Sequence, residues 1–178
     1  MRRRRLGAAT LVVTLAVLAG SATARAQEAQ TSTATGSRPV GLVGARYAAP
    51  TRWTGGLGVL IPLRKPRQDG DLGDLREHRG LEVEASAGVG GARLSIGPAF
   101  VGKPLAGPVL FAGDLLIGLT RTWNSPHRAS ADSSYVGFEG GLTLLMVRFS
   151  AGMAHQVGGP DRSNATIFTW SIGMQTGW

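Results

Sequence analysis

The sequence contains no cysteine among its 178 residues, which excludes disulfides, zinc–thiolate sites and cysteine nucleophiles. Charged residues make up only 17% of the chain and aromatic residues only 6%. After residue 26 the chain has no uncharged apolar run as long as the roughly 18 residues that a membrane-spanning helix needs. Any membrane crossing by this part must therefore be made by strands, because only helices and closed barrels satisfy every backbone polar group in lipid.

The first 26 residues have the three-part pattern of a secretory signal peptide. Four consecutive arginines begin at Arg2, an uncharged apolar stretch (LGAATLVVTLAVL) follows at residues 6–18, and a small-residue A-x-A cleavage site ends at Ala26. The apolar stretch is too short to anchor the chain in a bilayer as a helix. We therefore expect residues 1–26 to be a signal peptide that is removed on export, with a twin-arginine signal as a minor alternative.

Removal of that segment also removes most of the basic character. The whole chain carries 19 Lys and Arg against 11 Asp and Glu, and five of the arginines lie in the first 26 residues. The remaining 152 residues, an ordinary length for one domain, carry 14 basic and 11 acidic residues, a net charge of +3. Nucleic-acid binding depends on a strongly basic surface, so we expect no nucleic-acid partner.

The rest of the chain is typical of short strands. Residues 27–37 (QEAQTSTATGS) are polar and predict a flexible N-terminal tail. From residue 38 onward, glycine-rich apolar segments alternate with turn-rich stretches, and an interior glycine costs a helix about 1 kcal/mol relative to alanine. We predict an all-β domain over residues 38–178 with eight strands. They are expected at residues 39–48, 52–63, 81–90, 93–102, 109–122, 135–144, 146–156 and 167–178.

The last segment has the clearest alternation. Apolar and aromatic side chains occupy one parity, and small or polar ones the other, which indicates a strand with one apolar face. Two tryptophans share the apolar parity, as expected of a strand that places its rings at the interfacial belts of a membrane barrel. That parity includes Phe168, Trp170, Ile172, Met174 and Trp178.

This ending, FTWSIGMQTGW, resembles the C-terminal recognition strand of bacterial outer-membrane barrels, and the nearest group is the small OmpA/OmpX-like barrel domains. The resemblance implies that these five apolar residues form a C-terminal insertion signal. The resemblance covers the signal peptide, the last strand and the glycine-rich alternation. It implies an antiparallel up-and-down transmembrane β-barrel of about eight strands in a Gram-negative outer membrane, inserted by the barrel assembly machinery. The implied partners are outer-membrane lipid and lipopolysaccharide, and the implied state is a monomer.

The other segments repeat the alternation, and charges within strands fall on the parity opposite the apolar residues. That face is rich in Gly, Ser and Thr, which suits the narrow interior of an eight-stranded barrel. We expect these charges to face inward and to pair as a plug, since an isolated buried charge is very costly. A polar conduit is the alternative. The expected lumen charge network is Arg52, Glu82, Glu84, Arg93, Asp114, Glu139 and Arg148.

Parity alone does not fix the radial sense, because a soluble barrel exchanges inside and outside without changing the alternation. A soluble, lipocalin-like periplasmic barrel that binds an apolar ligand is therefore the first alternative. A lipid-modifying barrel enzyme is the second. Lipid A deacylases carry a His and a Ser close together in an H-x-S-N pattern, whereas an expected loop separates His155 from Ser163.

We therefore expect no enzymatic activity, no catalytic residue and no cofactor. The acidic stretch DGDLGDLRE at residues 69–77 does not fit the spacing of an EF-hand calcium loop, so no metal site is expected either. The expected role is structural or surface-interacting, with a narrow pore as a variant.

The charged connection at residues 64–79 conflicts with the usual layout of such barrels. Counting eight strands back from a periplasmic C-terminus places it on the periplasmic side, where connections are normally short. Either the strand count is off by one near residues 81–102, or this barrel has an unusual periplasmic connection.

Overall fold

The computed structural model describes residues 39–63, 67–68, 75–104, 109–124, 126–160 and 166–177. The expected signal peptide, the expected N-terminal tail and Trp178 lie outside these residues. Within the described residues no helix is long and apolar enough to cross a membrane.

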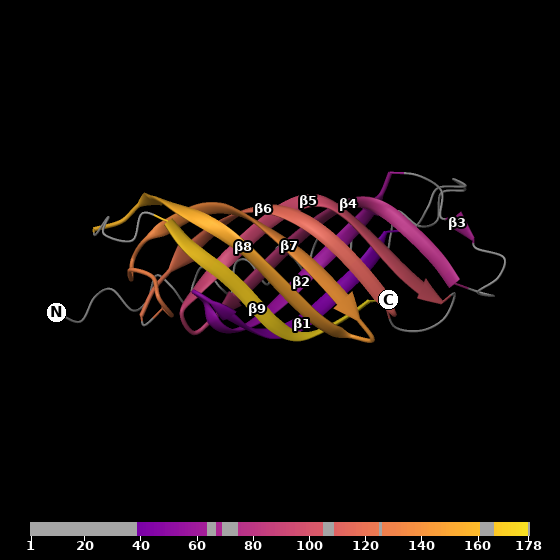
Figure 1. Cartoon of the computed structure of the whole chain (residues 1–178), viewed down its shortest axis with the longest axis horizontal. Helices are drawn as coiled ribbons and strands as arrows, with labels where there is room; N and C mark the ends of the chain where they lie inside the picture. The colour runs from indigo at the N-terminus through magenta and orange to yellow at the C-terminus, as the bar shows by residue number, and fades with distance from the viewer. Residues whose placement is uncertain are drawn as a thin grey trace, which may run out of the picture. The chain divides into compact units, whose positions relative to one another are not determined.

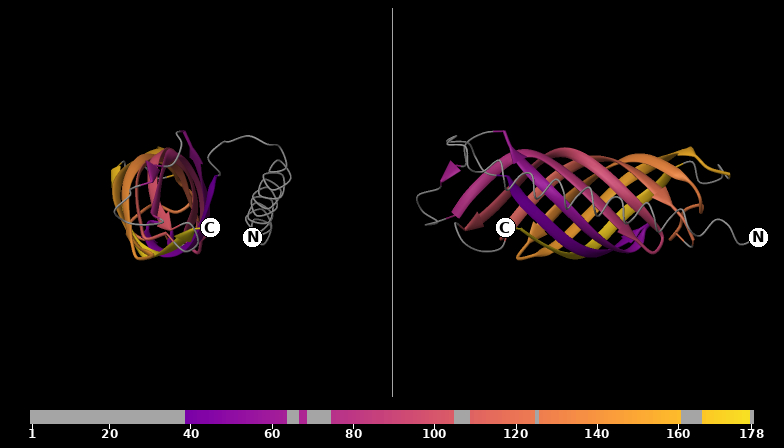
Figure 2. Two further views of the ribbon diagram at one scale, coloured as in Figure 1. Left: turned by 90° about the vertical axis from the view of Figure 1, so that its right-hand side faces the viewer. Right: turned by 180° about the vertical axis from the view of Figure 1, so that it is seen from behind.

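The described chain forms nine strands, of which eight close into a barrel (Figures 1 and 2). Each barrel strand pairs antiparallel with its neighbour along the chain, β1 also pairs with β9, and the barrel therefore has up-and-down topology. This confirms the predicted all-β class, the antiparallel barrel and the count of eight barrel strands. The strands are β1 (Val40–Ala49), β2 (Arg52–Pro62), β3 (Arg67–Gln68), β4 (Leu75–Gly88), β5 (Gly91–Pro104), β6 (Phe111–Thr122), β7 (Ser134–Leu144), β8 (Val147–Gly158) and β9 (Thr166–Gly177).

The two ends of the barrel have different connections. We call the end that holds the start of β1 and the end of β9 the terminal end, and the opposite one the far end. Two-residue turns join β1 to β2 and β4 to β5 at the far end, and β7 to β8 at the terminal end. In the last of these, Leu145 and Met146 both have positive φ, the geometry of the type I′ turn that suits the twist of a hairpin.

The expected strand boundaries differ most at β4, which begins at Leu75 instead of residue 81. Its first residues pair with the last residues of β5, Leu75 opposite Pro104, and with the two-residue strand β3. The sequence predicts a loop for the charged residues there. In the structure they continue the pairing of β4 with β5 beyond the end of β2. The connection between β2 and β4 starts and finishes at the terminal end. The count of eight strands is therefore correct, and the charged connection lies at the end of the barrel where β9 finishes.

The radial sense is decided by burial. Along β6, Leu116 and Thr120 are buried, whereas Leu115, Ile117 and Leu119 are exposed on the outer wall. Along β8 the alternation is strict, with Arg148 and Ser150 buried and Phe149 exposed between them. The apolar parity therefore faces outward, and the parity with the charges faces the lumen.

Candidate functional site

Three ion pairs lie in the lumen, and each joins two strands that are separated by a third. Arg148 on β8 pairs with Asp114 on β6, its Nη2 donating to Oδ1 at 2.9 Å. Arg93 on β5 pairs with Glu139 on β7. The third pair also crosses one strand. Because each pair spans an intervening strand, the three pairs link strands that are not hydrogen-bonded to each other.

The third pair joins Arg46 on β1 to Glu84 on β4, across β2. A second contact of Arg46 runs from Nη2 to the hydroxyl of Ser86 at 3.4 Å. The sequence does not predict that Arg46 faces the lumen. On β1 the inward parity also holds the apolar residues Val40 and Leu42, so charged and apolar side chains do not lie on opposite faces there.

Each ion pair passes over an inward-facing glycine of the strand it crosses. A β-carbon at Gly141 on β7 would lie 2.6 Å from Nη2 of Arg148 and 2.7 Å from Oδ2 of Asp114. A β-carbon at Gly118 on β6 would lie 2.9 Å from Nε of Arg93, and one at Gly56 on β2 would lie 3.4 Å from Oε1 of Glu84. Because glycine has no side chain, each of these positions leaves space for the ion pair that crosses it.

Of the seven residues expected in the lumen network, five take part in the ion pairs and two do not. Arg52 is exposed at the far end, where β2 begins, and has a φ of 63°. Glu82 is only 2% exposed in the lumen, yet its Oε1 has no hydrogen-bond partner among the described residues. The lumen therefore holds four carboxylates and three arginines within the described part of the chain.

Hydrogen bonds that involve uncharged side chains extend the network around the ion pairs. Nη1 of Arg148 donates to the Oε1 of Gln175 at 3.0 Å, and the hydroxyl of Thr143 contacts the same oxygen at 3.4 Å. The hydroxyls of Ser150 and Ser171 share a hydrogen bond across β8 and β9. A cavity of about 20 Å³ beside Arg148 has room for about one water molecule.

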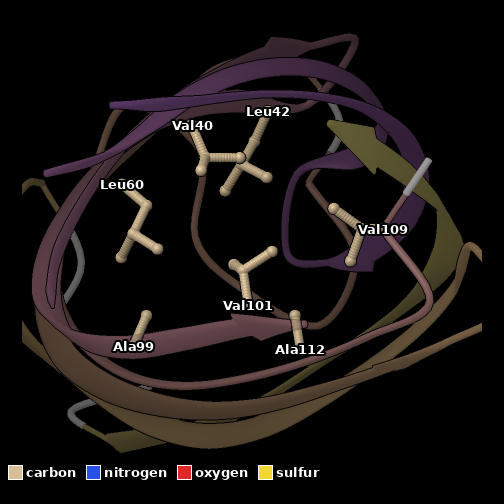
Figure 3. Packing of buried hydrophobic residues seen from close by; sticks show 7 residues of the cluster. All are labelled: Val40, Leu42, Leu60, Ala99, Val101, Val109 and Ala112. Atoms are coloured by element: carbon tan, nitrogen blue, oxygen red, sulfur yellow. The ribbon is translucent and has the colours of Figure 1, made fainter. Parts of the chain in front are cut away.

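Apolar side chains fill the lumen at the terminal end. Figure 3 shows seven of them pointing into the barrel from β1, β2, β5 and β6, and from Val109, two residues before β6 begins. At this end the interior is packed with apolar side chains as in a soluble core. Its members are Val40, Leu42, Leu60, Ala99, Val101, Val109 and Ala112.

A hydrogen-bonded loop covers the lumen at the far end. In the segment between β6 and β7, the backbone N–H of His127 donates to the carbonyl of Pro50 and that of Trp123 to the carbonyl of Gly90, both at 2.9 Å. Beneath it, the phenolic oxygen of the fully buried Tyr135 accepts a hydrogen bond from the backbone N–H of Ser130 at 3.0 Å. The charged centre of the lumen is thus enclosed from both ends.

The outer wall carries an aromatic group near each end. At the far end the ring of Tyr47 lies 5.5 Å from Trp53 and 5.8 Å from Trp170, and at the terminal end Phe100 lies 6.3 Å from Phe111. Between the two groups the exposed residues are almost entirely aliphatic or phenylalanine. The expected insertion signal lies on this wall: Phe168, Ile172 and Met174 are exposed on it and Trp170 is half-buried, whereas Trp178 is outside the described residues.

No arrangement suited to catalysis is found in the described part of the chain. His155 is exposed, and its Nδ1 lies 3.1 Å from the hydroxyl of Thr166. Ser163 and Asn164, which the deacylase comparison requires, lie outside the described residues. No group of three or more His, Asp or Glu side chains that could hold a metal ion occurs among the described residues, and the acidic residues between positions 69 and 74 lie outside them.

No protein-family model matches this chain, and no curated protein or solved structure gives a significant match.

Proposed function

We propose that this protein is an integral β-barrel of a Gram-negative outer membrane, with a structural or surface-interacting role and no enzymatic activity. The observation that carries the proposal is the inverted polarity of the barrel. Its wall is apolar outside, and three ion pairs lie inside.

The outer wall is too apolar for a surface that faces water. Large exposed apolar side chains lie on β2 and on every strand from β5 to β9, among them Ile117 (62% exposed) on β6 and Phe168 and Met174 on β9. Monomeric soluble proteins rarely expose contiguous apolar patches larger than about 300–600 Å². A bilayer removes this surface from water, and the aromatic groups at the two ends match the interfacial girdles of membrane barrels.

The enclosed lumen favours a structural or surface role over a pore. An ion or solute crossing the barrel would have to displace the apolar cluster at the terminal end and the loop at the far end, besides separating buried ion pairs. The far end also carries the segment at residues 123–133, whose exposed residues include Asn124 and Arg128. That segment is the surface we propose for contacts outside the cell.

The two alternatives have less support. A lipocalin-like binder needs an apolar internal cavity, but the centre of this lumen is filled by Arg93, Arg148 and their carboxylate partners. A lipid-modifying enzyme needs a nucleophile activated by a base and an orienting group. His155 contacts only a threonine hydroxyl among the described residues.

Fractionation of cells expressing the full-length chain tests the proposal. We expect the protein in the outer-membrane pellet after carbonate extraction, and we expect faster gel migration when the sample is not heated, as for other closed barrels. Release into the periplasmic fraction, with the same migration before and after heating, would contradict the proposal and restore the soluble binding protein as the leading interpretation.

A further inference from the structure

A groove on the outer wall near the terminal end is lined by residues of β4, β5, β6 and β7, four strands that lie next to one another in Figure 1. Its volume is about 810 Å³, and it is open to the surroundings of the barrel. Its lining is largely apolar and includes Pro98, Phe100, Leu115 and Leu142. One end of it is charged, because Glu77 and Arg79 of β4 also line it.

Outward-facing glycines occur in the groove and beside it. Gly113 lines the groove, and the ring of Phe100 fills the place of its missing β-carbon, which would come within 2.5 Å of the ring. Gly140, the cross-strand partner of Leu115, lies beside the groove and faces open space: a β-carbon there would meet nothing nearer than the carbonyl oxygen of Asp114 at 3.8 Å. The described residues that line the groove belong to strands, except Leu63, which follows β2.

Arg79 lies at the charged end of the groove. The side chain of Arg79 is 68% exposed, and its Nε donates to Oε1 of Glu77 at 2.6 Å. Arg79 lies directly opposite Phe100 in the β4–β5 ladder, so the guanidinium is next to the aromatic group of the terminal end. A planar guanidinium binds phosphate oxygens through two parallel hydrogen bonds.

We propose that this groove binds one anionic glycerophospholipid, with an acyl chain along Leu115 and Leu142 and the phosphate at Arg79. The proposal rests on the proposed membrane location. The ligand must be amphiphilic, because the apolar lining and the arginine belong to one continuous groove. In the proposed orientation the terminal end faces the periplasm, so the lipid belongs to the inner leaflet of the outer membrane.

A second copy of the chain fits the groove less well. Its outer wall would have to bring an acidic group to Arg79, but the only acidic residue on the outer wall of the described strands is Glu77, which already binds that arginine. A phospholipid supplies the anion and the apolar chain in one molecule, and it is present at high concentration in the membrane itself.

Spin-labelled lipids in reconstituted vesicles test the site. The full-length protein is folded into phosphatidylcholine vesicles that contain a small fraction of either phosphatidylglycerol or phosphatidylcholine labelled on the acyl chain. The motionally restricted fraction of each label is then measured by electron paramagnetic resonance. The variants are Arg79→Gln at the rim and Gly140→Leu beside Leu115 and Leu142. The matched control is Arg121→Gln, an exposed arginine on the outer wall of β6 at the far end.

We expect the wild type to restrict phosphatidylglycerol in preference to phosphatidylcholine. Arg79→Gln should lower that preference about three- to tenfold through loss of a charge-assisted hydrogen bond. Gly140→Leu should reduce the restricted fraction of both labels, and Arg121→Gln should leave the preference unchanged. All variants should insert and keep their heat-dependent migration.

An inserted wild type without lipid preference would overturn this inference and leave the proposed function intact. Equal effects of Arg79→Gln and Arg121→Gln would also overturn it, because they would point to general surface charge. Cross-linked dimers lost in Gly140→Leu would assign the groove to a second copy instead. Failure of the wild type to insert at all would contradict the proposed function itself.

Discussion

The inner and outer faces of the barrel come from the same strands but follow opposite rules. On the inner face Arg46, Arg93 and Arg148 each pair with a carboxylate over a glycine of the intervening strand. On the outer face of the described strands, exposed arginines such as Arg79 and Arg121 lie near the strand ends, and the middle of the wall is aliphatic and aromatic. Buried charges are thus neutralised by pairing inside the barrel, whereas the apolar side chains outside it are left exposed; under the proposed function, lipid covers them.

The largest effect is expected from breaking one inner pair. Asp114→Ala leaves Arg148, which is 2% exposed, buried without its carboxylate partner. Such a loss costs about 3–5 kcal/mol of folding free energy. Urea titration of the protein in lipid vesicles, followed by heat-dependent migration, measures it.

The double variant Asp114→Leu with Arg148→Met is the control for that loss. Replacing both charges by apolar residues of similar volume is often close to neutral, so it should recover most of the stability. A double variant as unstable as Asp114→Ala would show that the charge imbalance is not the cause.

A charge on the outer face should cost somewhat less, and the cost should depend on depth. Ile117→Arg places a cation in the middle of the outer wall of β6, where the penalty in a bilayer is about 2–4 kcal/mol. Val89→Arg places one in the exposed β4–β5 turn, where about 0–1 kcal/mol is expected. The yield of folded protein in vesicles compares the two. If Ile117→Arg instead folds as well as the wild type and raises solubility in water, the outer wall faces water.

Neighbouring glycines on opposite faces offer a smaller and sharper contrast. Gly141→Ala introduces a methyl group between Arg148 and Asp114, and overpacking of this kind costs about 1–3 kcal/mol. Gly140→Ala adds the same methyl group to the outer wall, where nothing lies within 3.8 Å, and should change the stability by less than about 0.5 kcal/mol. Equal effects in urea titrations would mean that the ion pair does not need the glycine.

The smallest effect concerns the unpaired carboxylate of the lumen. Glu82→Gln removes a buried charge that has no bridging arginine, so we expect a neutral or slightly stabilising change of about 1 kcal/mol or less. Glu84→Gln, two residues along the same face, removes the partner of Arg46 and should destabilise the barrel. A destabilisation by Glu82→Gln as large as that of Glu84→Gln would show that Glu82 also balances an arginine.

The sequence predicts the strands and their two faces because the alternation has a period of two residues wherever a strand separates apolar from polar neighbours. It predicts the inward charges of β4 to β8 for the same reason. It does not predict Arg46, since β1 is apolar on its inward parity near the terminal end, and it wrongly includes Arg52, whose parity fits but whose position is in the turn region.

The sequence also does not predict which charged side chains pair with each other in the folded barrel. Which arginine meets which carboxylate depends on the register between strands, and the glycine under each pair belongs to a third strand. The extension of β4 back to Leu75 depends on the length of β5, which offers partners beyond the end of β2. The groove near Arg79 likewise brings together residues of β4, β6 and β7, which are far apart in the chain.

The most direct test of the central claim is the environment of successive outward residues on β6 in a bilayer. The chain has no cysteine, so single cysteines can replace Leu115, Ile117, Leu119 and Arg121 and carry a spin label. We predict that oxygen dissolved in lipid relaxes the labels at positions 115, 117 and 119 more strongly than a water-soluble nickel complex does. At position 121 we predict the reverse. Strong relaxation by the nickel complex at all four positions would place the outer wall in water and contradict the account.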